Sequence, residues 1–250
     1  MNVPAMSLPG AEPLPLTPGL YPARFWPANI LRLHLVFPQA IDAGDSAQPV
    51  RLFDAAGRER LDVFADIPGG LWSACGRILT VLLHPGRVKR GLAARDRLGP
   101  GLVAGETVTL TLSSALRGAD GGPHGLPERF LIRIAPPVFG PIPSVAFRRT
   151  GHGLRLGGPA PIDALGALSY IRLIAPDGAA LFGRLAPLTG WALHLSPSHA
   201  PCPHFRFEIV AALEDCCGNR RDAGFEVLAA SSAMPPTVTG DLPCLTTSPN

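Results

Sequence analysis

Four residues of the types that bind metal ions lie close together in the second half of the chain. They fall within eleven residues and are His194, His199, Cys202 and His204. Imidazole and thiolate together suit zinc or copper, and a hairpin would bring alternate positions together. These residues predict a Zn or Cu site, which would make the protein a metal-binding carrier. The spacing H-x4-H-x2-C-x-H matches no standard zinc finger, so the alternative is surface histidines with a small buried thiol.

A second group of residues, between positions 87 and 97, could bind an anion. It contains one acidic residue, Asp96, and five basic ones, which are Arg87, Lys89, Arg90, Arg95 and Arg97. Arginine binds carboxylate or phosphate through paired hydrogen bonds, and the neighbouring glycines would let backbone amides approach the same ligand. We therefore expect a partner- or anion-binding site here. The alternative is a solvated basic loop, or a brace that forms salt bridges with the second domain.

The adjacent pair Cys216 and Cys217 could carry redox chemistry. Neighbouring cysteines can form a strained disulfide, and strained disulfides are the labile ones. The alternative is that they are two small residues in a turn, one of them buried. The chain has five cysteines with no regular spacing, so we expect no disulfide framework.

Known catalytic motifs are absent from the sequence. It contains no G-x-S-x-G, no P-loop, no G-x-G-x-x-G after a predicted strand and no H-E-x-x-H. Carboxylates such as Asp42, Asp163, Glu214 and Asp215 fall at predicted strand ends and turns, where we expect them to bond the local backbone. We therefore expect no enzymatic activity, and no cofactor apart from the metal considered above.

The composition indicates the elements that must position these residues. The 29 Pro and 28 Gly together are 57 of 250 residues, about 23%, against roughly 12% in an average protein. Pro and Gly both disfavour helix interiors, which excludes a helical bundle or coiled coil. The apolar content of 46% argues against a wholly disordered chain. Many short strands separated by turns satisfy both observations and predict an all-β fold.

Net charge and hydropathy exclude two classes of interaction. The net charge of +3 is too small to indicate nucleic acid binding by itself. No stretch approaches the roughly 20 apolar residues that span a bilayer. The first residues also lack the basic and continuous apolar segments of a secretory signal. We expect no transmembrane segment and no nucleic acid partner.

One pattern of residues occurs twice in the chain. An Asp, a Leu within a V/I-R-L strand and a turn Gly recur at an offset of 121, from Asp42, Leu52 and Gly57 to Asp163, Leu173 and Gly178. Ala-Leu followed by a turn Gly recurs at an offset of 97, from Gly121 to Gly218. The second copy has therefore lost residues, around positions 86–103. Each V/I-R-L strand precedes a Gly-containing turn, which we expect to close a hairpin.

This repeat predicts two β-sandwich domains, residues 24–136 and 137–228, joined by a stiff Pro-rich segment. Residues 1–23 contain six prolines and predict an extended arm, and residues 229–250 predict a flexible tail. Both ends are interpreted as solvated spacers. The alternative is that one of them lies in a groove of a partner protein.

Several motifs resemble a known family. The order F-P-x-x-I-D, V-R-L-F-D-A-A-G, L-T-V-L-L-H-P and A-L-x4-G, with the closing D-x-x-G-N of the second copy, is similar to bacterial Ig-like domains of S-layer and other surface proteins. The resemblance covers about residues 28–228. It implies two tandem Ig-like antiparallel β-sandwich domains in a non-catalytic module. It also implies an extracytoplasmic location, in the periplasm or at the cell surface, and other proteins of an envelope or surface assembly as partners.

Overall fold

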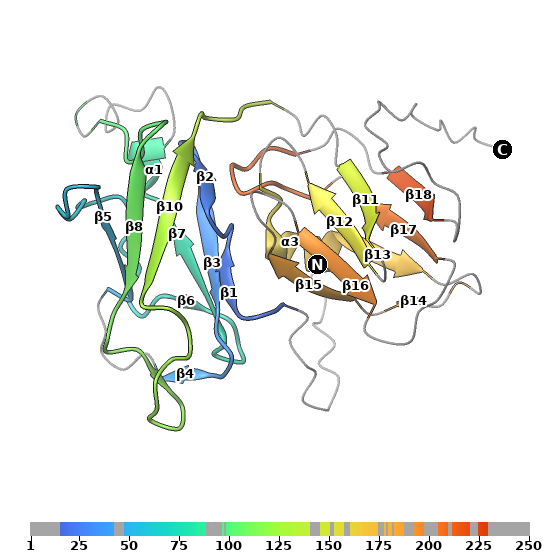
Figure 1. Ribbon diagram of the computed structural model, residues 1–250, viewed down its shortest axis with the longest axis horizontal. Helices are drawn as coiled ribbons and strands as arrows, with labels where there is room; N and C mark the ends of the chain where they lie inside the picture. Colours follow the sequence, from blue (N-terminus) through green and yellow to red (C-terminus); the bar gives the residue numbers. More distant parts are fainter. Residues whose placement is uncertain are drawn as a thin grey trace, which may run out of the picture.

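Strands make up almost all of the regular structure in the computed structural model, which confirms the all-β prediction (Figure 1). The helices α1 (Pro85–Val88) and α3 (Ala164–Tyr170) are short. No helix in the described part of the chain is long and apolar enough to span a bilayer. The structure describes residues 16–42, 48–88, 97, 99–140, 146–150, 153–157, 161–174, 178, 180–181, 183–187, 193–197, 205–209, 212–220 and 225–229.

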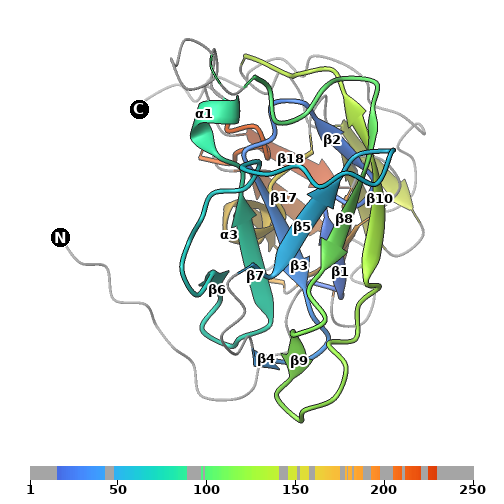
Figure 2. The same ribbon diagram turned by 90° about the vertical axis from the view of Figure 1, so that its left-hand side faces the viewer.

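The first half of the chain forms two four-stranded sheets, here called the N-terminal sheet pair. Their strand orders are β1-β3-β7-β6 and β2-β10-β8-β5, and Figure 2 shows β7 and β10 on opposite sides of this pair. The bounds in the first sheet are β1 Gly19–Tyr21, β3 Arg32–Val36, β7 Ile78–Leu82 and β6 Leu71–Trp72. Those in the second sheet are β2 Phe25–Pro27, β10 Arg129–Ala135, β8 Thr107–Leu112 and β5 Val50–Phe53.

Alternation of apolar and polar residues explains how these sheets pack. Along β8, Val108, Leu110 and Leu112 are buried while the threonines between them are half-buried, as the period of two requires. The inward residues of both sheets form one apolar core that includes Trp26 and Leu33, both 0% exposed. Burial of such side chains from two facing sheets is what holds a β-sandwich together.

The second half of the chain forms two further four-stranded sheets, here called the C-terminal sheet pair. Their strand orders are β11-β12-β16-β15 and β14-β13-β17-β18. The bounds in the first sheet are β11 Ala146–Thr150, β12 Gly153–Gly157, β16 Leu193–Pro197 and β15 Gly183–Pro187. Those in the second sheet are β14 Ala180–Leu181, β13 Ile171–Ile174, β17 Phe205–Ile209 and β18 Phe225–Ala229.

The repeat seen in the sequence recurs in the strand pairing. In the first half, β4 (Ile41–Asp42) pairs with β9 (Arg117–Gly118), and Ile41 lies opposite Gly118. The equivalent positions in the second half also lie opposite each other. They are Ile162, which is 121 residues after Ile41, and Asp215, which is 97 residues after Gly118. The bridge between Arg117 and Pro123 likewise recurs 97 residues later, between Glu214 and Arg220. Each of these turns has a Gly with positive φ, Gly121 at 78° and Gly218 at 80°.

The predicted hairpins are present. After β5, the chain turns at Asp54–Gly57, and Phe53 bridges back to Glu59. After β13, the chain returns to pair with it as β14. Gly57 and Gly178 both have positive φ in these turns, which explains why glycine occupies both positions.

The structure corrects the predicted arm. Residues 1–23 were expected to form an extended Pro-rich arm that is a solvated spacer, but β1 pairs with β3, and Leu20 and Tyr21 are buried. Apolar burial at these two positions outweighs the preference of the neighbouring prolines for a solvated chain. Residues 1–15 and the predicted tail from residue 230 on lie outside the described residues. The helix α3 was also not predicted.

Candidate functional site

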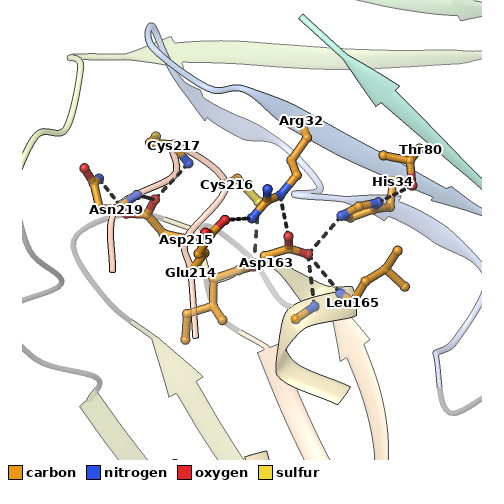
Figure 3. A network of polar contacts seen from close by, with 12 residues as sticks. Arg32, His34, Thr80, Asp163, Leu165, Glu214, Asp215, Cys216, Cys217 and Asn219 are labelled. Carbon is orange, nitrogen blue, oxygen red and sulfur yellow. Dashed lines mark hydrogen bonds and ion pairs between the residues drawn. The ribbon is translucent and has the colours of Figure 1, made fainter. Parts of the chain in front are cut away.

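A buried polar network joins the two sheet pairs. It consists of Arg32 and His34 on β3, Thr80 on β7, Asp163 before α3, and Glu214 in the turn after β17, and is called the interface network below. Figure 3 shows Arg32 and His34 reaching from one sheet toward Asp163 and Glu214. Such a cluster of charged groups, mostly shielded from water, is the part of the described chain with the most unusual chemistry.

The alternation of side chains along β3 and β7 positions the residues that the N-terminal sheet pair contributes to this network. Leu33 and Leu35 of β3 point into the apolar core, so Arg32 and His34 emerge on the outer face of the same sheet. Thr80 is the cross-strand partner of His34 in β7. The outer face of this sheet therefore presents a guanidinium, an imidazole and a hydroxyl side by side.

Asp163 supplies the central carboxylate. It is the N-cap of α3, and its Oδ1 accepts hydrogen bonds from the backbone amides of Leu165 at 3.0 Å and Gly166 at 3.2 Å. The same oxygen lies 2.9 Å from His34 Nε2, and Oδ2 forms an ion pair with Arg32 Nε. The prediction that this carboxylate bonds local backbone is confirmed, and the contacts with β3 are additional.

His34 is the most deeply enclosed member of the network, with 2% of its surface exposed. Its Nδ1 lies 3.0 Å from Thr80 Oγ1 and its Nε2 lies 2.9 Å from Asp163. In the neutral imidazole with hydrogen on Nε2, Nε2 donates to the carboxylate and Nδ1 accepts from the threonine hydroxyl. Both ring nitrogens are thus used within the protein.

The charges in the network perturb one another. Burial alone would raise the pKa of Asp163, but the hydrogen bond with His34 and the charge of Arg32 outweigh it and lower that pKa to about 2. Burial would lower the pKa of Arg32, yet the carboxylates of Asp163 and Glu214 raise it. The Asp163 carboxylate and the Arg32 guanidinium therefore both stay charged at neutral pH.

The turn at residues 214–220 holds the rest of the network in place. Asp215 is buried, and its Oδ1 accepts from the amides of Cys217 at 2.8 Å and Asn219 at 2.9 Å. Burial raises its pKa despite these bonds. The carboxylate of Glu214 bridges Arg32 and Arg220, each at 2.5 Å. One closing turn thus fixes two carboxylates beside β3.

Backbone contacts bring this turn against the N-terminal sheet pair. The amide of Leu31 donates to the carbonyl of Cys216 at 2.8 Å, and Cys216 belongs to the same apolar core as Leu33. Val138 of the connecting segment accepts from both Asn29 and Asn219 side chains, at 2.6 Å and 3.3 Å. The two halves of the chain are therefore joined by main-chain and apolar contacts as well as by charges.

The predicted redox pair consists of free, buried thiols. Burial raises the pKa of Cys216 and of Cys217, and the carboxylates of Asp163 and Asp215 add to the effect at Cys216. Only the thiolate reacts readily with oxidants and disulfides. This geometry favours the interpretation as small residues packed in a turn.

The predicted anion site is described only at its ends. Arg87 lies in α1, and its guanidinium donates to the backbone carbonyls of Leu61 at 2.9 Å, Asp62 at 3.2 Å and Gly99 at 3.5 Å. These bonds connect loops within the first half of the chain. Arg97 is exposed. Lys89, Arg90 and Arg95 lie outside the described residues.

The predicted metal site falls almost wholly outside the described residues. The backbone of His194 lies in β16, opposite Arg155 in β12 and Ala186 in β15. His199, Cys202 and His204 are not described. Within the described part of the chain, no three His, Cys, Asp or Glu residues are grouped as metal ligands.

The sequence contained only part of the signal for the interface network. Arg32 and His34 alternate with leucines in the sequence, a pattern typical of a half-buried strand, and the repeat singled out Asp163. Nothing in the sequence paired them, because Arg32 and Asp163 are 131 positions apart and contact depends on how the two halves dock.

Comparisons with known proteins add little. No family model and no curated protein matches the chain. Among solved structures, it is similar to the N-terminal part of the bacterial S-layer protein SbsC, with 11% identity and a TM-score of 0.30 over 87% of this chain and 44% of that one. It is also similar to the S-layer protein rSbsC(31-844), with 12% identity and a TM-score of 0.31 over 86% of this chain and 32% of that one. The chain spans less than half the length of either.

Proposed function

We propose that this chain is a non-catalytic structural or protein-interaction module made of two tandem Ig-like β-sandwich domains. In this proposal it belongs to a bacterial envelope or surface assembly, as the sequence resemblance implies. The observation that carries the proposal is the interface network, in which charged groups of one half are used to hold the other half.

Strand order supports the duplication. The sheet β1-β3-β7-β6 corresponds to β11-β12-β16-β15, and β5-β8-β10 corresponds to β13-β17-β18. The cross-strand pairs Leu33–Val81 in the first copy and Leu154–Leu195 in the second occupy equivalent positions in these orders. A duplicated sandwich whose copies dock through fixed contacts is suited to setting the spacing between binding partners.

The arrangement of Thr80, His34 and Asp163 has the same order of groups as a nucleophile, a base and an orienting acid. Catalysis by such a triad requires a substrate beside the base. Here the imidazole is 2% exposed, and both its nitrogens are bonded inside the interface. The burial therefore supports a role for these groups in docking the two halves.

Small-angle X-ray scattering of the whole chain tests the structural role. The double variant Arg32→Ala with Asp163→Ala removes both charges, so neither is left buried alone. We expect the variant to have a larger radius of gyration and a scattering profile of two mobile bodies, while the wild type scatters as one rigid body.

The control is Glu59→Gln, whose partner Arg51 is 3.8 Å away on a solvent-exposed surface. It should scatter as the wild type does. A double variant that folds and keeps the compact profile of the wild type would remove the main support for the proposal.

A further inference from the structure

The outer face of the sheet β2-β10-β8-β5 carries exposed arginines. Burial alternates along β10, and Ile132 belongs to the apolar core. The residues on the other side of β10 therefore point outward, and they are Arg129, Leu131 and Arg133. Arg51 of β5 is exposed and lies in the same cross-strand row as Arg129. This outward surface is called the arginine face below, and it points away from β3 and β7 (Figure 2).

The strand register arranges the side chains of the arginine face in rows across the sheet. The rows are Arg129–Thr111–Arg51, Leu131–Thr109–Phe53 and Arg133–Thr107. Leu131 in the middle row is 70% exposed. Successive rows are about 7 Å apart, because every second residue of a strand lies on the same face. A row with two apolar side chains therefore lies between two rows that contain arginine.

The acidic residues that come just before β8 and β10 in the chain do not neutralise these arginines. Glu106 precedes β8, and its carboxylate accepts two hydrogen bonds from the Arg60 guanidinium. Glu128 precedes β10. Burial lowers the pKa of His124, and the charge of Glu128 lies near enough to oppose this effect. Both carboxylates thus act on other parts of the first half.

Most of the positive charge on the arginine face is uncompensated. Within the described part of the chain, the single ion pair on this face joins Arg51 and Glu59 at 3.8 Å. Such an exposed pair stabilises a protein by less than about 1 kcal/mol. The described ion pairs include neither Arg129 nor Arg133. These two guanidiniums are therefore available to a partner of opposite charge.

The mixture of charge and apolar surface indicates the class of that partner. Arginine binds carboxylates through paired hydrogen bonds, and an apolar centre with arginine beside it is typical of protein interfaces. A phosphate polymer would supply negative charge but no apolar group to cover Leu131. The net charge of +3 is also small for a protein that binds nucleic acid. These properties favour an acidic protein segment.

We infer that the arginine face binds an extended acidic segment of a partner protein, with an apolar residue between two carboxylates at positions i, i+2 and i+4. The inference rests on the proposed function as an interaction module and adds the chemistry of the partner. Arg129, Leu131 and Arg133 have this same spacing along β10. An extended segment laid along β10 would place each carboxylate over an arginine and the apolar residue over Leu131.

The size of the arginine face predicts weak binding. It extends about 14 Å along β10 and about 14 Å across the four strands, which gives roughly 200 Å² of sheet. A stable interface buries about 800 Å² on each partner. Binding through this face alone should therefore be weak, and it should weaken further as salt screens the charges.

Fluorescence anisotropy of a labelled peptide, titrated with the whole chain in low salt, tests this inference. The probe is a peptide containing Glu-Thr-Leu-Thr-Glu, and the control peptide has Gln in place of both Glu residues. We expect the probe to bind at least tenfold more tightly than the control. Arg129→Ser and Arg133→Ser should each weaken binding of the probe about tenfold, because each removes one guanidinium–carboxylate pair.

Two further variants separate a specific contact from general attraction. Leu131→Thr leaves the charge unchanged and should weaken binding about fivefold, because an apolar contact is lost. The double variant Arg129→Glu with Arg133→Glu should bind a peptide containing Lys-Thr-Leu-Thr-Lys in place of the probe. Arg117→Ser is the matched control, because it removes an exposed arginine of β9 and should bind as the wild type does. Circular dichroism should show every variant folded.

Three results would each overturn the inference. The wild type does not bind the probe in low salt, or Arg117→Ser weakens binding as much as Arg129→Ser does. The third is tighter binding of inorganic polyphosphate that Arg129→Ser abolishes and Leu131→Thr leaves unchanged, which would assign the face to a phosphate polymer. The scattering experiment is independent of these outcomes. A rigid chain that does not bind the probe would reject this partner and leave the proposed function intact.

Discussion

At the scale of single residues, the interface network shows how a buried charge is tolerated. The Asp163 carboxylate accepts hydrogen bonds from two backbone amides, is hydrogen-bonded to the imidazole of His34 and forms an ion pair with the guanidinium of Arg32. Its side chain is 7% exposed. These three hydrogen bonds to Oδ1 and the ion pair at Oδ2 offset the desolvation of the carboxylate. Asp42, the equivalent residue of the first copy, is exposed. The same residue type therefore has different energetic weight in the two copies.

Asp163→Asn should lower the free energy of unfolding by roughly 2–3 kcal/mol, because Arg32 then loses a charged partner inside the interface. Urea denaturation followed by circular dichroism measures this. Asp42→Asn is the matched control from the other copy, and it should change stability much less. Equal losses in the two variants would contradict the distinction.

The pKa of Asp163 predicts how its contribution depends on pH. The ordinary pKa is 3.8 and the folded-state pKa is about 2, so the unfolded chain takes up a proton first as the pH falls. The stabilisation is complete above about pH 4 and is lost as the pH falls through 2. The difference in unfolding free energy between wild type and Asp163→Asn should be constant at pH 5–7 and shrink toward pH 2. A difference that stays constant down to pH 2 would count against this charge state.

At the scale of elements, a repeated turn has acquired two different roles. The turn at residues 117–123 lies between β8 and β10 of the first copy, and its equivalent at residues 214–220 lies against β3. Asp120 makes one exposed hydrogen bond to the amide of Gly122 in the first turn. In the second turn, Asp215 is buried and bonds to the amides of Cys217 and Asn219. The backbone path is shared, and the side chains decide what the turn contacts.

Asp215→Ala should cost roughly 2–3 kcal/mol of unfolding free energy, because two amides in a largely buried turn lose their acceptor. Asp120→Ala removes one exposed hydrogen bond and should cost much less. Thermal and urea unfolding of both variants provide the comparison. If Asp120→Ala proved as damaging, burial of the second turn would not be the cause.

At the scale of the whole molecule, the two sheet pairs are coupled through shared contacts. Cys216 packs in the N-terminal core, and Leu31 donates to its carbonyl. Coupling of this kind makes the unfolding of one half expose surface of the other. Two units with a rigid, partly apolar interface are expected to unfold together.

Differential scanning calorimetry should therefore show one unfolding transition for the wild type. The Arg32→Ala and Asp163→Ala double variant should split it into two, since each half then unfolds with less influence from the other. Two separate transitions in the wild type would show that the halves are energetically independent.

Local patterns determined much of this protein without reference to its tertiary structure. The Pro, Gly and apolar content predicted short strands, glycines such as Gly57 predicted hairpins, and constant offsets revealed the repeat, because strands and turns depend on neighbouring residues. The sequence predicted an arm up to residue 23. In the structure, β1 pairs at the edge of a sheet, because apolar side chains next to the prolines are buried there.

Only the tertiary structure decided which residues meet. Asp42 and Asp163 are equivalent in sequence, yet Asp163 alone lies against Arg32 and His34. Arg87 belonged to a predicted anion site, yet its guanidinium is taken by backbone carbonyls. Contacts between residues far apart in the chain depend on how whole sheets dock, and the free energy of docking is summed over many side chains at once. A repeated sequence therefore predicts the same backbone twice, while the surface opposite each copy determines its role.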